Sequence, residues 1–317
     1  MSWQNKASEV LRAHVPAGSR ILAAVSGGPD SVSLACFLRH QPYSLVIGHI
    51  DHQLRAGSAA DAQFVRALAK KWDVPYRVKN VEVTVFAQRH HLGIEEAARN
   101  LRYRELGRMA RQSRCQGIVT AHTADDQAET ILMNFLRGAG PAGLAGMPAV
   151  QHLPHAGKIP IVRPFLGVRR DQIIRFIKQH SLPCRYDPTN RSLRFMRNRI
   201  RYDALPYLEK LYPGVGGRLV QSADIFRGEE EFWRNLIAPL FRQTVRKNGP
   251  KITVVLPRLL RYHKALSRRI LRHILPGLSF QDIEQVLTLA RSPERRAWLR
   301  LSGRRRVKRE SNRLVVA

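Results

Sequence analysis

The stretch Ile21-Leu22-Ala23-Ala24-Val25-Ser26-Gly27-Gly28-Pro29-Asp30-Ser31-Val32 decides the fold of this chain. Residues 21–25 are an apolar run typical of a buried strand, and residues 32–38 continue as an apolar helix. A strand that turns through two glycines into a helix N-terminus binds anions, because backbone N–H groups converge there and the helix dipole adds positive potential. The hydroxyls of Ser26 and Ser31 and the carboxylate of Asp30 suit a site where Mg²⁺ bridges carboxylate and phosphate. We call residues 26–31 the glycine loop and predict that it binds phosphate.

Two other phosphate-binding motifs do not fit the sequence. A Walker A loop requires Gly-Lys followed by Ser or Thr, but Gly157-Lys158 is followed by Ile159. The string Gly138-Ala139-Gly140-Pro141-Ala142-Gly143 has the glycine spacing of a dinucleotide-binding loop. It follows an amphipathic run rather than a strand, whereas that fingerprint requires the strand first. We interpret this string as a glycine-rich helix C-terminus.

Strand-like and helix-like segments alternate after the glycine loop, which predicts an α/β fold with a doubly wound parallel sheet. We expect strands at residues 44–50, 76–85, 117–121 and 159–162, and helices at residues 61–72, 94–111, 125–137 and 170–180. Beyond Pro213 the pattern changes to helices at residues 219–244, 263–274 and 280–290, followed by a hairpin over residues 306–316. We therefore predict a catalytic domain, residues 1–212, and a second, smaller, mainly helical domain, residues 213–317.

The chain is strongly basic. Its 317 residues include 54 Lys and Arg against 24 Asp and Glu, a net charge of +30, and residues 216–317 alone carry 23 basic and 8 acidic residues. Such an excess lies on the surface and attracts a polyanion with release of its counterions, so we expect a large nucleic acid as partner. A membrane surface is the alternative, but no basic amphipathic helix with an aromatic face supports it.

Cysteine usage and hydropathy indicate a cytoplasmic protein without a membrane partner. Cys36, Cys115 and Cys184 form no C-x-x-C pair, which argues against a zinc site and a disulfide framework and suits a reducing compartment. Residues 1–15 lack the apolar core of a signal peptide, and no apolar stretch approaches the length of about 18 residues that a membrane span needs.

Polar side chains follow two further strands, at the edge of the sheet where ligands bind. His52 lies just beyond the second strand, where a nucleotide base or ribose would lie; an ordinary histidine-containing loop is the alternative. His122 follows the strand at residues 117–121. Three acids crowd the first turns of the next helix: Asp125, Asp126 and Glu129. This cluster suits a metal–phosphate site, and a helix cap is the alternative.

Arginines are concentrated in two segments. Between residues 185 and 201 there are six arginines and one acid, Asp187, and the planar guanidinium is the group best suited to phosphate. Arg99 and Arg102 are three residues apart and share a helix face. For this second segment a salt-bridged surface helix is the alternative.

Together these segments resemble the tRNA(Ile)-lysidine synthetase family, one of the N-type ATP pyrophosphatases, whose loop has the pattern S-G-G-x-D-S. The resemblance covers nearly the whole chain. It rests on D-H-x-L-R at residues 51–55, E-x-A-R-x-x-R-Y ending at Tyr103, A-H-x-x-D-D-Q-A-E-T at residues 121–130, R-G-x-G-x-x-G-L at residues 137–144, and D-P-x-N followed by R-N-R-I-R at residues 197–201. Residues 256–316 resemble the family's substrate-binding domain more weakly. We expect a short form, whose tRNA contacts differ from those of members with a further C-terminal domain or are fewer.

The resemblance implies that the chain uses ATP and Mg²⁺ to join free L-lysine to C2 of the wobble cytidine of tRNA(Ile) with a CAU anticodon. The cytidine oxygen attacks the α-phosphate and expels pyrophosphate, and the lysine amine then displaces AMP. It implies ATP binding by Ser26, Gly27, Gly28, Pro29, Asp30, Ser31 and His52. The implied catalytic residues are Asp30, His122, Asp126, Arg99, Arg102 and Arg201, with Asp30 and Asp126 also holding the metal. His122 would either hydrogen-bond the α-phosphate or activate the attacking group.

The remaining site residues are expected to recognise the two other substrates. We expect tRNA binding by Arg197, Arg199, Arg304, Arg305, Arg306 and Lys308. The ammonium groups of lysine need an acidic partner, for which we select Asp187, with Asp125 or Glu129 as companions. The alternative is that Asp187 only pairs with Arg185 or Arg191. A homodimer is compatible with these expectations.

Two other functions fit part of the sequence. A tRNA thiolase has the same loop but usually carries paired cysteines, which this chain lacks. A non-catalytic basic RNA-binding protein would not need an intact glycine loop.

Overall fold

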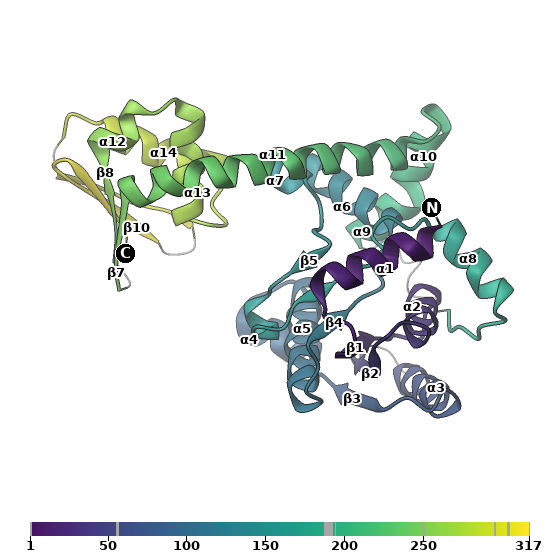
Figure 1. Cartoon of the computed structure of the whole chain (residues 1–317). Coiled ribbons are helices and arrows are strands. Elements are labelled where there is room, and N and C mark those ends of the chain that lie inside the picture. The colour runs from purple at the N-terminus through teal and green to yellow at the C-terminus, as the bar shows by residue number, and fades with distance from the viewer. Residues whose placement is uncertain are drawn as a thin grey trace. The chain divides into compact units, whose positions relative to one another are not determined.

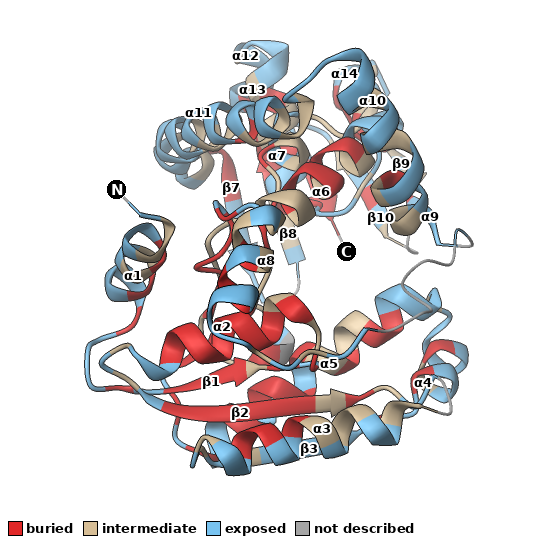
Figure 2. Cartoon of the chain, turned by 90° about the vertical axis from the view of Figure 1, so that its right-hand side faces the viewer, coloured by how far each residue is buried: buried red, intermediate tan, exposed pale blue. Residues whose placement is uncertain are grey.

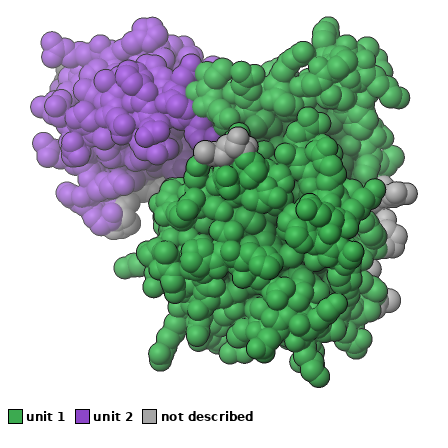
Figure 3. Space-filling model, turned by 45° about the vertical axis from the view of Figure 1, so that its right-hand side comes forward, with its two compact units in different colours: residues 1–226 green, residues 227–317 purple. Residues whose placement is uncertain are grey.

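The computed structural model describes residues 2–54, 57–186, 193, 195–249, 251–294, 296–302 and 305–316. The chain forms two compact units, Met1–Phe226 and Arg227–Ala317 (Figure 3). The division falls inside helix α11 (Val215–Thr244), which begins just after the domain boundary expected at residue 213; that boundary stays a prediction. No helix among the described residues has both the length and the apolar character that crossing a membrane requires.

The first unit is built on a six-stranded sheet with the strand order β3-β2-β1-β4-β6-β5 (Figure 1). The parallel strands are β1 (Arg20–Ala24), β2 (Ser44–Asp51), β3 (Tyr76–Asn80), β4 (Gly117–Val119) and β6 (Ile161–Val162), and β5 (Val150–Gln151) adds an antiparallel edge. From β1 the chain runs outward to β2 and β3 and then returns to β4 on the other side of β1. Sheets with such a reversal bind ligands beyond the carboxyl ends of the two central strands. The predicted fold class is confirmed.

Helices cover both faces of this sheet because its strands are apolar on both sides. In β1, Ile21 and Ala23 pack with α1, α2, α3 and α8, whereas Leu22 packs with α5. Figure 2 shows β1 and most of β2 buried. The helices of the unit are α1 (Trp3–His14), α2 (Pro29–Arg39), α3 (Ser58–Lys71), α4 (Val83–His90), α5 (Ile94–Gln112), α6 (Ala124–Leu136), α7 (Pro141–Leu144), η1 (Pro154–Ala156), α8 (Arg170–Gln179), α9 (Met196–Arg199), the π-helical segment η3 (Ile200–Ala204) and α10 (Leu205–Leu211).

The strand expected at residues 76–85 is wrong in its second half. It ends at Asn80, and α4 begins at Val83. The alternating valines at 81, 83 and 85 suggest a strand, but Val83 and Ala87 are buried together against α5 while Val85 is exposed. That four-residue spacing is helical, so packing against α5 overrides the local β propensity. The glycine-rich string begins as the C-terminus of α6, as predicted, with Gly138 at φ +72°. Its second half was not predicted correctly, because Pro141–Leu144 form α7 with Gly140 as N-cap.

The second unit combines helices with a five-stranded antiparallel sheet of order β7-β8-β11-β10-β9. Its helices besides the end of α11 are α12 (Leu256–Arg261), α13 (Lys264–Ile274) and α14 (Phe280–Arg291), and its strands are β7 (Val245–Asn248), β8 (Lys251–Val255), β9 (Arg296–Arg300), β10 (Arg306–Glu310) and β11 (Arg313–Val316). The sequence predicted α11, α13, α14 and the β10–β11 hairpin, and it missed the short helix α12. It also missed β7, β8 and β9. Two of them, β7 and β9, were missed because they are rich in basic residues and lack a clear apolar alternation. The core of the unit lies between one face of the sheet and the three helices.

Candidate nucleotide-binding and catalytic site

The glycine loop leads from β1 into α2 at the point where the strand order reverses. Gly27 has φ +94°, a conformation that favours glycine, and a Cβ there would lie 3.2 Å from the Phe64 ring. The Ser26 N–H donates to Ser31 Oγ at 3.1 Å, and Ser31 Oγ donates to the Gly28 carbonyl at 3.0 Å. Gly28 is the N-cap of α2 and makes no side-chain cap, so backbone N–H groups at this terminus are available to an anion.

Asp30 lies in the first turn of α2, and its carboxylate is half-buried. Its Oδ1 is enclosed yet has no hydrogen-bond partner among the described residues. Burial raises the pKa of Asp30 from 3.8 to about 6; Arg170 opposes this shift and Asp126 adds to it. A half-buried carboxylate with free lone pairs, beside a phosphate-binding helix terminus, fits Mg²⁺, which proteins hold through one or two carboxylates together with substrate phosphates.

Asp126 and Glu129, on α6, form an ion cluster with two arginines from the α9–η3 segment. Arg197 Nη2 and Arg201 Nη2 both donate to Asp126 Oδ1 at 2.9 Å. Arg197 Nε donates to Glu129 Oε2 at 2.9 Å, and Arg201 donates to both oxygens of Glu129. Glu129 is buried, with a side-chain exposure of 2%. We call these four residues the α6 ion cluster.

The other oxygen of Asp126 is occupied by the helix cap. Thr123 donates to Asp126 Oδ2 through its backbone N–H at 2.9 Å and through its hydroxyl at 3.1 Å. Sequence analysis offered two roles for Asp126, metal ligand or helix cap. The structure shows the cap, and the metal-binding role stays a prediction. Burial alone would raise the pKa of Asp126, but Arg197 and Arg201 stabilise its charged form and lower it.

The arginines of the ion cluster lie on a deformed helix. Between α9 and α10 the chain makes a π-helical turn, in which Leu205 N–H bonds to the Ile200 carbonyl. Pro206 follows within α10. Since proline has no N–H and its ring clashes with the carbonyl four residues earlier, an ordinary α-helix cannot continue through this point. π-helical turns are frequent at functional sites.

Two histidines at the strand ends are enclosed and neutral. His122 follows β4, and its Nδ1 lies 2.9 Å from Thr120 Oγ1. Burial lowers the pKa of His122 to about 3, and Asp126 only partly opposes this. His52 follows β2; its Nδ1 has no partner among the described residues, and burial together with Arg102 lowers its pKa to about 4. Both rings can therefore accept a hydrogen bond at neutral pH.

Arg163 and Arg102 add positive potential around His122, and Arg99 acts on both of these arginines. Arg99 lies over the Tyr103 ring, with Cζ 5.1 Å from its centroid. Arg102 is half-buried, its guanidinium has no hydrogen bond or ion pair among the described residues, and burial lowers its pKa. Arg163 was missed by sequence analysis. It is fully buried and donates to the Pro148 carbonyl at 2.8 Å and to Gln151 at 2.9 Å. Its place directly after β6, at the ligand-binding edge, was the available signal.

The remaining predicted site residues do not form one group in the structure. Asp187 and Arg304, predicted for lysine and tRNA, lie outside the described residues. Arg199 is exposed and lines an open groove of about 490 Å³ with Leu136 and Tyr207. Arg305 donates to the Pro276 carbonyl at 2.7 Å, whereas Arg306 and Lys308 are exposed on β10. Asp125, proposed as a companion for lysine, accepts the Arg170 N–H at 2.8 Å and so anchors the start of α8.

The loop, its place in the sheet and the half-buried carboxylates define a PP-loop domain, and a family model of that description matches residues 2–208. The tRNA(Ile)-lysidine synthase of Thermosynechococcus vestitus is 37% identical over 285 residues, which cover 87% of this chain and 79% of that protein. The enzyme of the same name from Synechococcus is 33% identical over 92% of this chain and 93% of its own length. This chain belongs to the tRNA(Ile)-lysidine synthase family.

A solved structure shares the fold at low sequence identity. The U34-tRNA thiolase NcsA from Methanococcus maripaludis, solved with its [4Fe-4S] cluster, is similar over 71% of this chain and 78% of its own, with a TM-score of 0.57 and 17% identity. This likeness concerns the fold alone. In the described part of this chain no three His, Cys, Asp or Glu side chains are grouped so that they could hold a metal ion.

Proposed function

We propose that this chain forms lysidine at the wobble cytidine of tRNA(Ile) with a CAU anticodon, using ATP and free L-lysine. The observation that carries the proposal is the glycine loop at the reversal of the sheet in a member of this family. A carbonyl oxygen of cytidine is a poor leaving group. Its attack on the α-phosphate of ATP expels pyrophosphate, and the lysine amine then attacks ring carbon C2 and expels AMP.

The glycine loop holds the pyrophosphate part of ATP in this proposal. Its backbone N–H groups and the hydroxyls of Ser26 and Ser31 bind phosphate oxygens. Asp30 would hold Mg²⁺, and the metal would supply positive charge beside the leaving pyrophosphate. The choice of Asp30 as metal ligand is supported by its Oδ1, which accepts no hydrogen bond from any described residue, whereas both oxygens of Asp126 already accept hydrogen bonds. We therefore assign the metal to Asp30 first, and Asp126 could join it only by giving up an arginine.

Arginines stabilise the charge that the transition state develops. The unpaired guanidinium of Arg102, with Arg99 one helical turn away, is free to bind phosphate oxygens, and this requires no rearrangement of ion pairs. His122 stays neutral, so we assign it a hydrogen bond to the reacting group, in which its ring accepts or donates according to the tautomer set by Thr120.

The α6 ion cluster is the proposed site of the free amino acid. A zwitterion needs a carboxylate beside its ammonium and an arginine beside its own carboxylate, and the cluster presents both types of group next to each other. Glu129, expected as a companion of Asp187, is its buried acid. Lysine binding here would exchange ion pairs rather than bury an unpaired charge, which keeps the desolvation cost low.

The test is an incubation of the protein with ATP, labelled L-lysine and total tRNA. We expect label in one isoleucine tRNA, with AMP and pyrophosphate released in equal amounts. Asp30→Asn should abolish AMP formation, while Asp171→Asn should retain it, because Asp171 is an exposed residue whose ion pairs within the described part of the chain are with Arg169 and Arg175. Label incorporation without ATP, or into tRNAs of every kind, would contradict the proposal.

A further inference from the structure

The five-stranded sheet of the second unit has two chemically different faces. Along β10, Val307 and Arg309 point to the helices, while Arg306, Lys308 and Glu310 lie on the opposite face, which we call the outer face. The register extends this face to every strand: Arg300, Trp298 and Arg296 oppose these three residues on β9. On the other side it continues through Arg313 and Val315, then Lys251, Thr253 and Val255, then Arg246 and Asn248.

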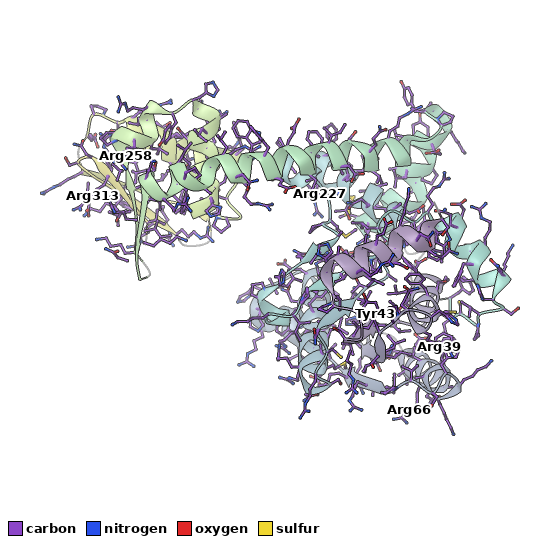
Figure 4. The ribbon with its side chains drawn as sticks, viewed as in Figure 1. Arg39, Tyr43, Arg66, Arg227, Arg258 and Arg313 are labelled. Atoms are coloured by element: carbon purple, nitrogen blue, oxygen red, sulfur yellow. The ribbon has the colours of Figure 1, made fainter. Side chains whose placement is uncertain are left out.

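The alternation sorts the basic residues of this region into two groups. Arg309 donates to the carbonyls of Leu289 and Ala290 at the end of α14, so it caps that helix. The outer face keeps Arg246, Lys251, Arg296, Arg300, Arg306, Lys308 and Arg313 together with a single acid, Glu310. Glu310 pairs with Lys308 at 3.3 Å and with Arg313 at 3.4 Å. The other five cations of the face have no ion pair among the described residues. Arg313 is labelled in Figure 4.

Trp298 lies among these cations. Its side chain is 68% exposed, and the indole makes no ring or cation–π contact with any described residue. Lys308 lies directly opposite on β10, and Arg296 and Arg300 flank it on the same face of β9. An exposed indole between unpaired cations is costly for a free surface, but it is the combination with which proteins bind single-stranded nucleic acid, since every base has a face that can stack.

We propose that the outer face binds tRNA, with phosphates on its unpaired cations and an unpaired base stacked on Trp298. The choice of tRNA as the nucleic acid rests on the proposed function. Charge complementarity supports an RNA rather than an acidic protein, because an acidic protein would need the cations but not the exposed indole. Because every second residue of a strand points to the same side, Arg296, Trp298 and Arg300 of β9 share this face with Arg306 and Lys308 of β10.

The experiment measures the dissociation constant of the full chain for an unmodified tRNA(Ile) transcript with a CAU anticodon across a salt series. Arg300→Gln combined with Arg306→Gln should weaken binding and reduce the log–log salt slope by about 1.5 to 2, because each lost phosphate contact removes about 0.7 to 0.9. Trp298→Ala should weaken binding about tenfold with an unchanged slope, and Trp298→Phe should restore most of the loss, because stacking is not ionic.

The control removes the same charge from the helical side of the unit. Arg261→Gln combined with Arg272→Gln changes two exposed arginines of α12 and α13 and should leave both quantities unchanged. An equal loss in this control, or unchanged binding in the outer-face variants, overturns the proposal. So does self-association of the wild-type chain that Trp298→Ala abolishes without an effect on tRNA. If tRNA binds as expected but no lysidine forms, the outer face stands and the proposed function fails.

Discussion

Replacing Asp30 by asparagine should stabilise the protein while abolishing its activity. The folded chain holds this carboxylate half-buried, with Oδ1 lacking a partner among the described residues, and its pKa is raised from 3.8 to about 6. A raised pKa means that ionised Asp30 is less favourable in the folded than in the unfolded chain. The asparagine variant keeps the size of the side chain and removes the charge.

The sign of the pH dependence follows from proton counting. Between pH 3.8 and about 6 the folded chain binds more protons at Asp30 than the unfolded chain, so its stability falls as the pH rises through this window. A shift of about two units corresponds to a cost of about 3 kcal/mol above pH 6. Solvent contact of the carboxylate reduces this cost, so we expect Asp30→Asn to gain about 1 to 2 kcal/mol at pH 7.5. Below pH 4 the gain should disappear.

The assay is chemical denaturation of the wild type, Asp30→Asn and the exposed control Asp171→Asn at several pH values without nucleotide or metal. In parallel, ATP with Mg²⁺ should stabilise the wild type by mass action and leave Asp30→Asn unaffected. The control should show no gain in stability over the wild type, and ATP with Mg²⁺ should stabilise it as much as the wild type. A variant less stable than the wild type at pH 7.5, or a gain of the same size at pH 4, would refute the inference that burial destabilises the ionised Asp30 carboxylate.

Three further substitutions address the rest of the molecule. Glu129→Gln should raise the KM for lysine at least tenfold, measured as label incorporation, because it removes the buried charge that Arg201 binds. Gly27→Ala should cost about 1 to 2 kcal/mol of stability, since alanine is strained at φ +94°, and should weaken ATP binding. Arg309→Met should lower the thermal stability of the second unit by about 1 to 2 kcal/mol through loss of the α14 cap, with no change in the salt slope of tRNA binding.

Each of these predictions has a distinguishing outcome. Glu105→Gln is the control for Glu129→Gln, because Glu105 is also buried and paired with arginines but lies outside the site, so its KM for lysine should not change. Equal effects in both variants would indicate a structural role. Normal ATP affinity of Gly27→Ala would contradict the prediction for the glycine loop. A salt slope of tRNA binding that Arg309→Met reduces as much as the outer-face variants do would contradict the prediction for the α14 cap.

Much of the architecture could be predicted because it depends on local sequence. The alternation of strands and helices, the glycine loop and the helix C-terminus after α6 follow from the spacing of apolar residues and from glycines at positions of positive φ. The prediction fails where packing outweighs propensity. Val83 belongs to α4 because α5 covers it, and β7 and β9 lack an apolar alternation that would mark them as strands.

The phosphate-binding loop at the edge of a doubly wound sheet can be predicted from local sequence, because the loop, its strand and its helix are contiguous in the chain. Which charges form ion pairs depends instead on tertiary packing. Asp126 and Glu129 bind Arg197 and Arg201 from a segment about 70 residues later, and Arg102 has no ion pair with any residue that the structure describes. Pairing of this kind depends on how distant helices pack, and strand register decides which arginines of the second unit reach the outer face. Neither is encoded in the local pattern of residues that specifies the elements themselves.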